Sequence, residues 1–513
     1  MTRRTLLTLS TAVPAIAAAD RYDVAIYGAT PAGLVAALAA VREGARVVLL
    51  EASRHIGGVV TGGLGATDKG NTAVIGGLAL EFFERVGKMY GGPACWWFEP
   101  GVAMKVFREW LQEAGVRPVL GEALAQVRKQ ANRIEAIRTA SGREVAAKVF
   151  VDASYEGDLI AQAGVSYIVG REGQRDFNES LAGRLEFSTW DQFWTIVNPY
   201  GDDGKLLPLI HPGDSGKPGE GDRKVQTYNF RLCLSNDRGN QVPFTEPPGY
   251  HPARFTLLAR YLANPGRDLT LNHVIMLVKI PNNKLDVNNN GPISTDYLGA
   301  SWDYPEGDGK RRGEIWEDHR RYTLGLLYFL ARDPRVPRHL QEEMNTWGFA
   351  KDEFIDSGHF PPQLYVREAR RMKGAYIMRQ DDVHLTVGKP DSVGMGSYPI
   401  DTHHFQRIAS PVGAVINEGF IVDRRTRPYQ LPYRCLIPKP GECDNLLVPV
   451  CCSASHVAYS SIRLEPQYMI LGHASGVAAA MCARTGTPVD RLEVPGLQER
   501  LREQRQILSL KSP

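Results

Sequence analysis

The chemistry of this sequence begins in residues 22–58, where glycines, a helix start and an acidic residue follow one another in a fixed order. Gly28 and Gly33 bound a tight turn, GATPAG, between an apolar strand (23–27) and a helical segment. The N-terminus of such a helix offers free N–H groups and the positive end of its dipole to a phosphate. Glu51 ends the next strand, where an acidic side chain accepts hydrogen bonds from an adenosine ribose. The order predicts a dinucleotide-binding βαβ unit.

The turn departs from the pattern G-x-G-x-x-G at one position, where Thr30 replaces the middle glycine. Thr30 is suited to cap the helix, and Pro31 and Ala32 occupy its first positions, where proline is favoured. The alternative is a parallel-sheet protein whose turn binds nothing. Strand, turn, helix, strand and terminal acid in register favour the dinucleotide site.

A second glycine cluster decides which dinucleotide is expected. Gly57 and Gly58 follow Glu51 and Ala52, and the run TGGLGATD occupies residues 61–68. With these residues the chain resembles the FAD-dependent oxidoreductases of the glutathione-reductase-like superfamily. It is more closely similar to a branch of secreted bacterial flavoproteins that are distantly similar to heterodisulfide reductase. The resemblance covers most of the chain and implies FAD rather than NAD as the primary cofactor, with the paired glycines under its pyrophosphate and ribityl.

Three further segments, 149–159, 391–405 and 455–480, match the same branch in the same order. Asp152, Ala153 and Asp158 follow a strand, at the sheet edge where ligands of doubly wound folds bind. In this superfamily the helix that begins near Pro466 points its N-terminus at the flavin pyrimidine ring, where its dipole favours negative charge. Arg463 adds a positive charge there, or else forms a local ion pair with Glu465. The expected FAD-binding residues are Gly28, Thr30, Pro31, Ala32, Gly33, Glu51, Ala52, Gly57, Gly58, Asp152, Ala153, Asp158, Arg463, Glu465 and Pro466.

Candidates for catalysis come from segment 391–405 and from residues 433–434, just before the chain is expected to rejoin the sheet of the FAD-binding domain. A histidine near the flavin can take the proton of an alcohol or amine as hydride leaves, because its pKa is near neutral. His403 and His404 are adjacent, so we expect at most one of them to face the flavin; a structural hydrogen bond is the alternative role. Arg434, after Tyr433, is a candidate anchor for a substrate oxygen or carboxylate.

Metal and disulfide chemistry have weaker support. Residues 286–291, DVNNNG, copy the first half of a calcium loop, but Tyr297 stands where the bidentate glutamate belongs, so we expect no metal. The seven cysteines include no C-x-x-C pair, so iron–sulfur ligands are missing. Cys435 and Cys443 flank a turn and are candidates for a disulfide; the alternative is that they are buried thiols.

The N-terminus predicts export. Residues 2–7, TRRTLL, resemble a twin-arginine signature, and an apolar stretch and small residues follow before Asp20. A disordered basic leader is the alternative. We expect a periplasmic or secreted enzyme with no transmembrane segment in its mature form, since no apolar run of 18 residues follows the leader. The 513 residues carry a net charge of +3, which gives no indication of nucleic-acid binding.

These features predict an α/β fold, a discontinuous, doubly wound parallel-sheet FAD/NAD(P)-binding domain with an inserted α+β substrate domain. Composition changes over the middle of the chain, with more Pro, Asn and aromatic residues. The predicted order is an export signal (1–19), the first segment of the FAD-binding domain (20–184), the inserted domain (185–420), the second segment of the FAD-binding domain (421–485) and a C-terminal helix (486–513).

The expected activity is that of an exported FAD-dependent oxidoreductase. Hydride passes from a small organic substrate to flavin N5, and oxygen or an exported electron acceptor reoxidises the flavin. A sugar-derived alcohol is the substrate that the resemblance suggests. The alternatives are an FAD-containing lyase or isomerase without net redox turnover, and a non-catalytic flavin-binding protein.

Overall fold

The computed structural model describes residues 20–510, except 186–187, 189, 214–215 and 386. The predicted export signal, residues 1–19, lies outside the described residues. No helix in the described part of the chain is long and apolar enough to cross a membrane.

A seven-stranded sheet carries the N-terminal glycines. Its strands in spatial order are β3 (Val119–Leu120), β2 (Val47–Glu51), β1 (Asp20–Tyr27), β6 (Glu144–Asp152), β5 (Arg133–Thr139) and β4 (Leu124–Gln130), with β21 (Leu446–Leu447) also beside β6. β3, β2, β1, β6 and β21 run parallel, and β5 and β4 extend β6 as an antiparallel meander. β21 pairs with Phe150 and Val151 of β6, so a segment from near the end of the chain completes the first domain. The discontinuous parallel sheet that we predicted is present.

Apolar side chains of β1 point alternately to the two faces of this sheet, so both faces are covered by a core. Val24 and Ile26 pack in the larger core, whereas Ala25 and Tyr27 pack in a second core on the other face. α1 (Pro31–Arg42), α3 (Gly77–Met89), α4 (Pro100–Glu113) and α12 (Glu465–Thr485) contribute to the larger core.

The small residues of α12 let it lie directly on α1. A Cβ atom at Gly472 would stand 2.3 Å from the carbonyl oxygen of Ala32, and one at Gly476 would stand 2.3 Å from that of Ala36. The two helix backbones therefore touch. This contact fixes the N-terminus of α12 relative to the turn that starts α1.

The residue pattern also predicts a helix over 101–118, a strand over 119–127 and an amphipathic helix over 490–508, and these elements differ in length in the structure. The helix expected over 101–118 is α4, which ends at Glu113, and Gly115 has a φ of +69°. The helix expected over 490–508 is α13 (Val494–Glu503); Leu497 and Leu501 are buried on it, and Leu508 is buried beyond its end. The strand expected over 119–127 is divided between β3 and β4.

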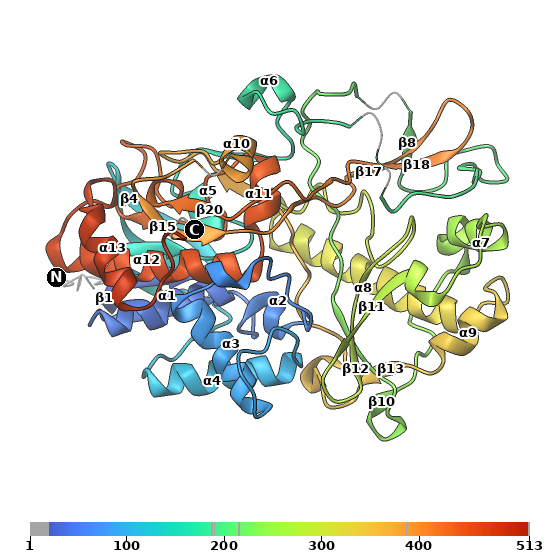
Figure 1. The fold of residues 1–513 in the computed structure, drawn as a ribbon, viewed down its shortest axis with the longest axis horizontal. Coiled ribbons are helices and arrows are strands. Elements are labelled where there is room, and N and C mark those ends of the chain that lie inside the picture. The colour runs from blue at the N-terminus through green and yellow to red at the C-terminus, as the bar shows by residue number, and fades with distance from the viewer. Residues whose placement is uncertain (1–19, 186–187, 189, 214–215, 386, 511–513) are drawn as a thin grey trace, which may run out of the picture.

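The middle of the chain forms a second body, on the right in Figure 1. Its five-stranded sheet is antiparallel, in the order β10 (Gln241–Val242), β13 (Gly348–Ala350), β9 (Leu232–Ser235), β12 (Lys284–Asn289) and β11 (Ile275–Ile280). Helices α7 (Thr256–Ala263), α8 (Gly309–Arg332) and α9 (Arg338–Met344) lie on the same side of Figure 1. β17 (Gln406–Ala409) pairs with β18 (Val415–Glu418) and with β8 (Ile210–Pro212) above them.

Some of the predicted insertion, however, lies against the first body. β14 (Arg370–Met372) pairs with β7 (Tyr167–Val169), and β15 (Ser392–Gly396) pairs with β20 (Tyr429–Pro432). In Figure 1, β15, β20 and α10 (Gln380–His384) lie on the left with α12. The remaining elements are α2 (Gly58–Thr61), α5 (Asp158–Gln162), α6 (Gln174–Phe177), β16 (Ile400–Asp401), β19 (Val422–Asp423) and α11 (His456–Ile462).

Candidate functional site

The turn between β1 and α1 has the backbone geometry that its glycines predict. Gly28 has a φ of +98°, and a Cβ there would lie 2.6 Å from the backbone nitrogen of Ser154. A Cβ at Gly33 would lie 1.9 Å from the carbonyl oxygen of Gly28. The hydroxyl of Thr30 accepts a hydrogen bond from the N–H of Gly33 at 3.3 Å and donates one to the carbonyl of Ala153 at 2.7 Å. Thr30 therefore caps α1, and Pro31 is its first residue.

Glu51 is held at the mouth of this turn. Its carboxylate accepts hydrogen bonds from the backbone N–H of Ala29 at 2.7 Å and of Ser53 at 2.8 Å. Gly57 and Gly58 follow with φ values of +85° and +49°. A Cβ at Gly58 would stand 2.3 Å from the hydroxyl of Tyr155, so a side chain there would fill the space beside the turn.

These residues line a cavity of about 400 Å³, which we call the cofactor cavity. Gly28, Thr30, Glu51, Ala52 and Gly58 form one wall, and residues 154–156 form another. The second body closes the cavity with Tyr304, Arg312, Trp316 and Pro362–Leu364. Its lining thus comes from segments that are hundreds of residues apart in the chain.

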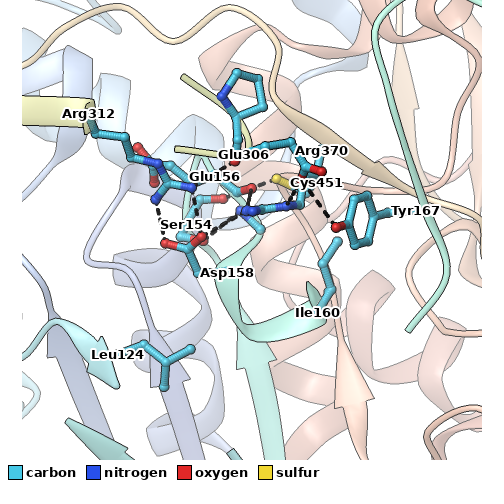
Figure 2. Close-up of polar contacts among 12 residues, drawn as sticks. Leu124, Ser154, Glu156, Asp158, Ile160, Tyr167, Glu306, Arg312, Arg370 and Cys451 are labelled. Carbon is cyan, nitrogen blue, oxygen red and sulfur yellow. Dashed lines mark hydrogen bonds and ion pairs between the residues drawn. The ribbon is translucent and has the colours of Figure 1, made fainter. Parts of the chain in front are cut away.

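Two of the predicted cofactor residues have their carboxylates engaged within the protein. Asp152 is fully buried and accepts hydrogen bonds from Ser154 and from the N–H of Ile160, and it is absent from the lining of the cofactor cavity. Burial raises the pKa of Asp152 to about 6. Asp158 does line the cavity, but Figure 2 shows Arg312 and Arg370 both reaching its carboxylate, at 2.7 Å and 2.8 Å. Asp152 therefore shapes its own loop, and Asp158 ties the two bodies together.

The start of α12 presents polar atoms that lack partners. Glu465 is 2% exposed, and its Oε1 accepts a hydrogen bond from the hydroxyl of Tyr155 at 2.6 Å, whereas its Oε2 has no partner among the described residues. Burial raises the pKa of Glu465 to about 8. The same Tyr155 hydroxyl accepts a hydrogen bond from the N–H of Val59 in α2, so this chain of contacts links α12 to the paired glycines.

Arg463, just before α12, is buried without a carboxylate partner within the described chain. Its Nη2 donates to the carbonyl of Asp401 at 2.9 Å and its Nη1 lies 3.3 Å from the hydroxyl of Tyr365. The local ion pair between Arg463 and Glu465, considered above as an alternative, is not formed. A buried, unpaired guanidinium requires an anion or a strongly polar group, which a flavin pyrimidine ring supplies. The glycine cradle, the helix start and these partnerless atoms fit FAD.

A second cavity of about 280 Å³ has Arg463 in its lining, and we call it the polar cavity. Carboxylates, amides, guanidinium groups and aromatic rings line it. The lining includes Asp68, Trp190, Asp191, Asn288, Tyr398, Asp401, His403 and Arg463. The hydroxyl of Tyr398 lies 3.0 Å from a carboxylate oxygen of Asp68 and 3.5 Å from one of Asp401. Burial raises the pKa of Asp401 to about 6 and that of Asp191 to about 7.

His403 lines the polar cavity and is connected through Asp296 to Arg367. Its Nδ1 lies 2.8 Å from Asp296, whose other carboxylate oxygen forms an ion pair with Arg367 at 3.0 Å. Asp296 therefore selects the tautomer with the proton on Nδ1, and no described residue bonds to Nε2. Burial and the charge of Arg367 lower the pKa of His403 to about 3, so Nε2 is a neutral proton acceptor.

His404 and Arg434 are not brought to the polar cavity. The Nε2 of His404 contacts the backbone carbonyl of Trp190 at 3.2 Å, and burial lowers the pKa of His404 to about 4. Arg434 is half exposed, binds Asp391 at 2.8 Å and lies over the ring of Tyr376. Of the two adjacent histidines, only His403 lines the polar cavity.

Other candidates from the sequence have structural partners. Asp286, in the segment that resembles half a calcium loop, pairs with Arg231 at 2.7 Å and accepts hydrogen bonds from the N–H groups of Gly65 and Ala66. The described residues include no cluster of three or more potential metal ligands. Cys435 and Cys443 are free, buried thiols, so the candidate disulfide is not formed.

The sequence did not point to the partners of His403. Asp296 and Arg367 lie in segments without a recognisable pattern, and only the fold brings them together. Asp68 and Tyr398 belong to the matching segments 61–68 and 391–405, so those segments carried a signal for them that we did not use.

The glycine cradle and the start of α12 define a class of protein, a flavin-dependent oxidoreductase. The model of the family described as "FAD dependent oxidoreductase" matches residues 23–501. The chain belongs to this family. It is an FAD-dependent oxidoreductase, and FAD is its cofactor.

Matches to solved structures are partial. A flavin-containing monooxygenase from Stenotrophomonas maltophilia is 16% identical, with a TM-score of 0.21, over 31% of this chain and 44% of that chain. THI4 from Thermovibrio ammonificans is 23% identical, with a TM-score of 0.24, over 30% of this chain and 67% of that chain. Thioredoxin reductase from T. acidophilum is 19% identical, with a TM-score of 0.18, over 26% of this chain and 34% of that chain. No curated protein sequence matches the chain.

Proposed function

We propose that this enzyme oxidises a small, neutral, hydroxyl-rich substrate, a sugar-derived alcohol, in the polar cavity, with His403 as the proton acceptor. The observation that carries the proposal is the His403–Asp296 pair, which leaves a neutral Nε2 on the cavity beside Arg463. FAD, when bound, supplies the hydride acceptor. The carbinol hydrogen leaves as hydride, the hydroxyl proton passes to His403, and the product is a carbonyl compound.

The lining of the polar cavity supports a neutral substrate. Asp68, Asp191 and Asp401 have no ion-pair partner in the described structure, and the unpaired cations on the lining are Arg463 and the exposed Arg424. Carboxylates in this number would repel a substrate carboxylate. Carboxylate and amide groups instead accept from and donate to hydroxyls, and Trp190, 47% exposed, offers a ring face.

Export and reoxidation complete the proposal. We place the enzyme in the periplasm or outside the cell, delivered by the twin-arginine-like leader, because that route carries proteins that have already folded around their cofactor. Oxygen or an exported electron acceptor then takes the electrons of the reduced flavin. We also propose that the middle of the chain, residues 185–420, acts as the substrate domain.

Visible spectroscopy tests the proposed substrate class. The purified enzyme is expected to be yellow, and its absorbance near 450 nm should bleach anaerobically with a subset of sugars, polyols or their amine analogues. Bleaching only with carboxylic acids would overturn the assignment of a neutral substrate. Conversion of a compound without any flavin bleaching would instead favour a reaction without net redox change.

A further inference from the structure

Most buried arginines in the described part of the chain form an ion pair with a carboxylate. Seven described arginines are buried, and five of them form ion pairs with Asp or Glu: Arg171, Arg231, Arg367, Arg370 and Arg371. The other two, Arg463 and Arg407, form none in the described structure. Arg463 lies where the flavin and the substrate are expected. Arg407 lies in β17 and does not line the cofactor cavity or the polar cavity, so neither the flavin nor the substrate accounts for its charge.

The contacts of Arg407 leave one side of its guanidinium free. Its Nε donates to the side-chain oxygen of Asn417 at 2.9 Å, and its Nη2 donates to the backbone carbonyl of Pro292 at 2.8 Å. Its Nη1 bonds to no described residue. Burial lowers the pKa of Arg407 to about 10, so the side chain still carries its charge at neutral pH. A buried charge without a counter-ion is strongly unfavourable.

A cavity of about 70 Å³ adjoins this guanidinium. Its walls are mostly aliphatic, with Tyr297, Tyr322 and Arg254 among them. The lining contains no Asp or Glu, so it offers Arg407 no carboxylate. The other cation on the lining, Arg254, already pairs with Asp318 at 2.6 Å. Leu209 in the wall has a φ of +61°, a strained conformation for a bulky residue, and such strain is concentrated at ligand-binding sites.

We propose that the cavity beside Arg407 binds a small monovalent anion, of the size of chloride or a short carboxylate. The cavity is large enough for such an ion, and its volume of about 70 Å³ excludes large polyanions. Water alone would fill the space but would leave the charge uncompensated. The anion takes its principal hydrogen bond from Nη1 of Arg407.

The anion would also stabilise one wall of the polar cavity. The side-chain nitrogen of Asn417 donates to the backbone carbonyl of Asp191 at 3.0 Å and to that of Pro292 at 2.9 Å. Asp191 lines the polar cavity, so a fixed Arg407 fixes Asn417 and through it this wall. The anion site itself does not depend on the identity of the substrate.

Thermal unfolding of the holoenzyme tests the site. Sodium chloride replaces sodium gluconate at constant ionic strength, with sodium acetate as a second arm. We expect a saturable rise in Tm of about 2 °C or more with chloride or acetate. Arg407→Met should abolish the rise. Arg138→Met, which removes an exposed arginine from β5, should retain it.

A second measurement covers the case in which Arg407→Met fails to fold. Crystals of the wild-type holoenzyme soaked in sodium bromide should show an anomalous peak in the cavity, within hydrogen-bonding distance of Arg407. A Tm that does not respond to either anion, together with no bromide peak, would overturn the proposal. An identical chloride response in wild type and Arg407→Met would overturn it as well.

Discussion

His403→Ala is the substitution that tests the proposed base most directly. The side chain is 7% exposed, lines the polar cavity and holds its Nδ1 on Asp296. Its removal leaves the glycine cradle, Glu51 and the start of α12 intact, so we expect FAD to remain bound with an unchanged visible spectrum. What is lost is the acceptor for the substrate proton.

The expected size follows from the protonation state of His403. Because its pKa is lowered to about 3, His403 is neutral at pH 7 and can accept a proton, but its low basicity places the expected loss toward the lower end of the range for a general base. Removing a general base slows a reaction by roughly 10²–10⁴-fold, which corresponds to about 3–5 kcal/mol in the activation free energy. His404→Ala is the matched control, since its ring contacts Trp190 and does not line the cavity.

Anaerobic stopped-flow reduction of the flavin, followed near 450 nm, is the appropriate assay. We expect His403→Ala to be slow at saturating substrate and His404→Ala to reduce the flavin at close to the wild-type rate. The wild-type rate should be independent of pH between about 5 and 8, because protonation of the base begins only near its lowered pKa. A wild-type rate in His403→Ala, with FAD still bound, would refute the reasoning.

Three further variants test other regions of the molecule. Glu51→Arg should yield a colourless protein, because a positive side chain replaces the acceptor for the ribose; retention of stoichiometric FAD on gel filtration would contradict this. Burial raises the pKa of Glu465 to about 8, so its contribution to stability is fully present below the unfolded value of 4.5 and is lost as pH rises through 8. The unfolding free energy of the wild type, measured in urea, should therefore fall between pH 5 and pH 9. In Glu465→Gln this fall should be smaller by up to about 4 kcal/mol. Replacing Arg3 and Arg4 by lysine should retain the FAD-loaded precursor in the cytoplasm, as cell fractionation would show, and normal secretion would rule out the twin-arginine route.

Local rules were sufficient for the cofactor cradle. Gly28 and Gly33 are required by the close approach of neighbouring backbone, and Thr30 and Pro31 by the helix start, so their roles are readable from a few adjacent residues. The parallel sheet followed from the same unit. Helix ends were less accurate, because the buried apolar pattern continues past the last helical residue: Val116 is buried beyond α4 and Leu508 beyond α13.

The polar cavity was only partly predictable, because its chemistry depends on contacts between distant residues. His403 was named from a matching segment, but the choice between His403 and His404 depends on Asp296, which is 107 residues away in the chain. Asp158, which lines the cofactor cavity, shows the same dependence on distant residues. Its position at the sheet edge suggested a cofactor contact, and the structure shows its carboxylate occupied by Arg312 and Arg370 from outside the first domain segment.

Asp401 is a second candidate base in the polar cavity, and the pH dependence of flavin reduction distinguishes it from His403. Asp401 has a carboxylate oxygen without a hydrogen-bond partner among the described residues, and burial raises its pKa to about 6. If Asp401 took the substrate proton, the rate of flavin reduction would rise as pH increases through about 6, and Asp401→Asn would abolish reduction. If His403 does so, the rate stays level across that range. Asp401→Asn should then leave most of the rate, because the carbonyl that binds Arg463 belongs to the backbone of Asp401 and survives the substitution.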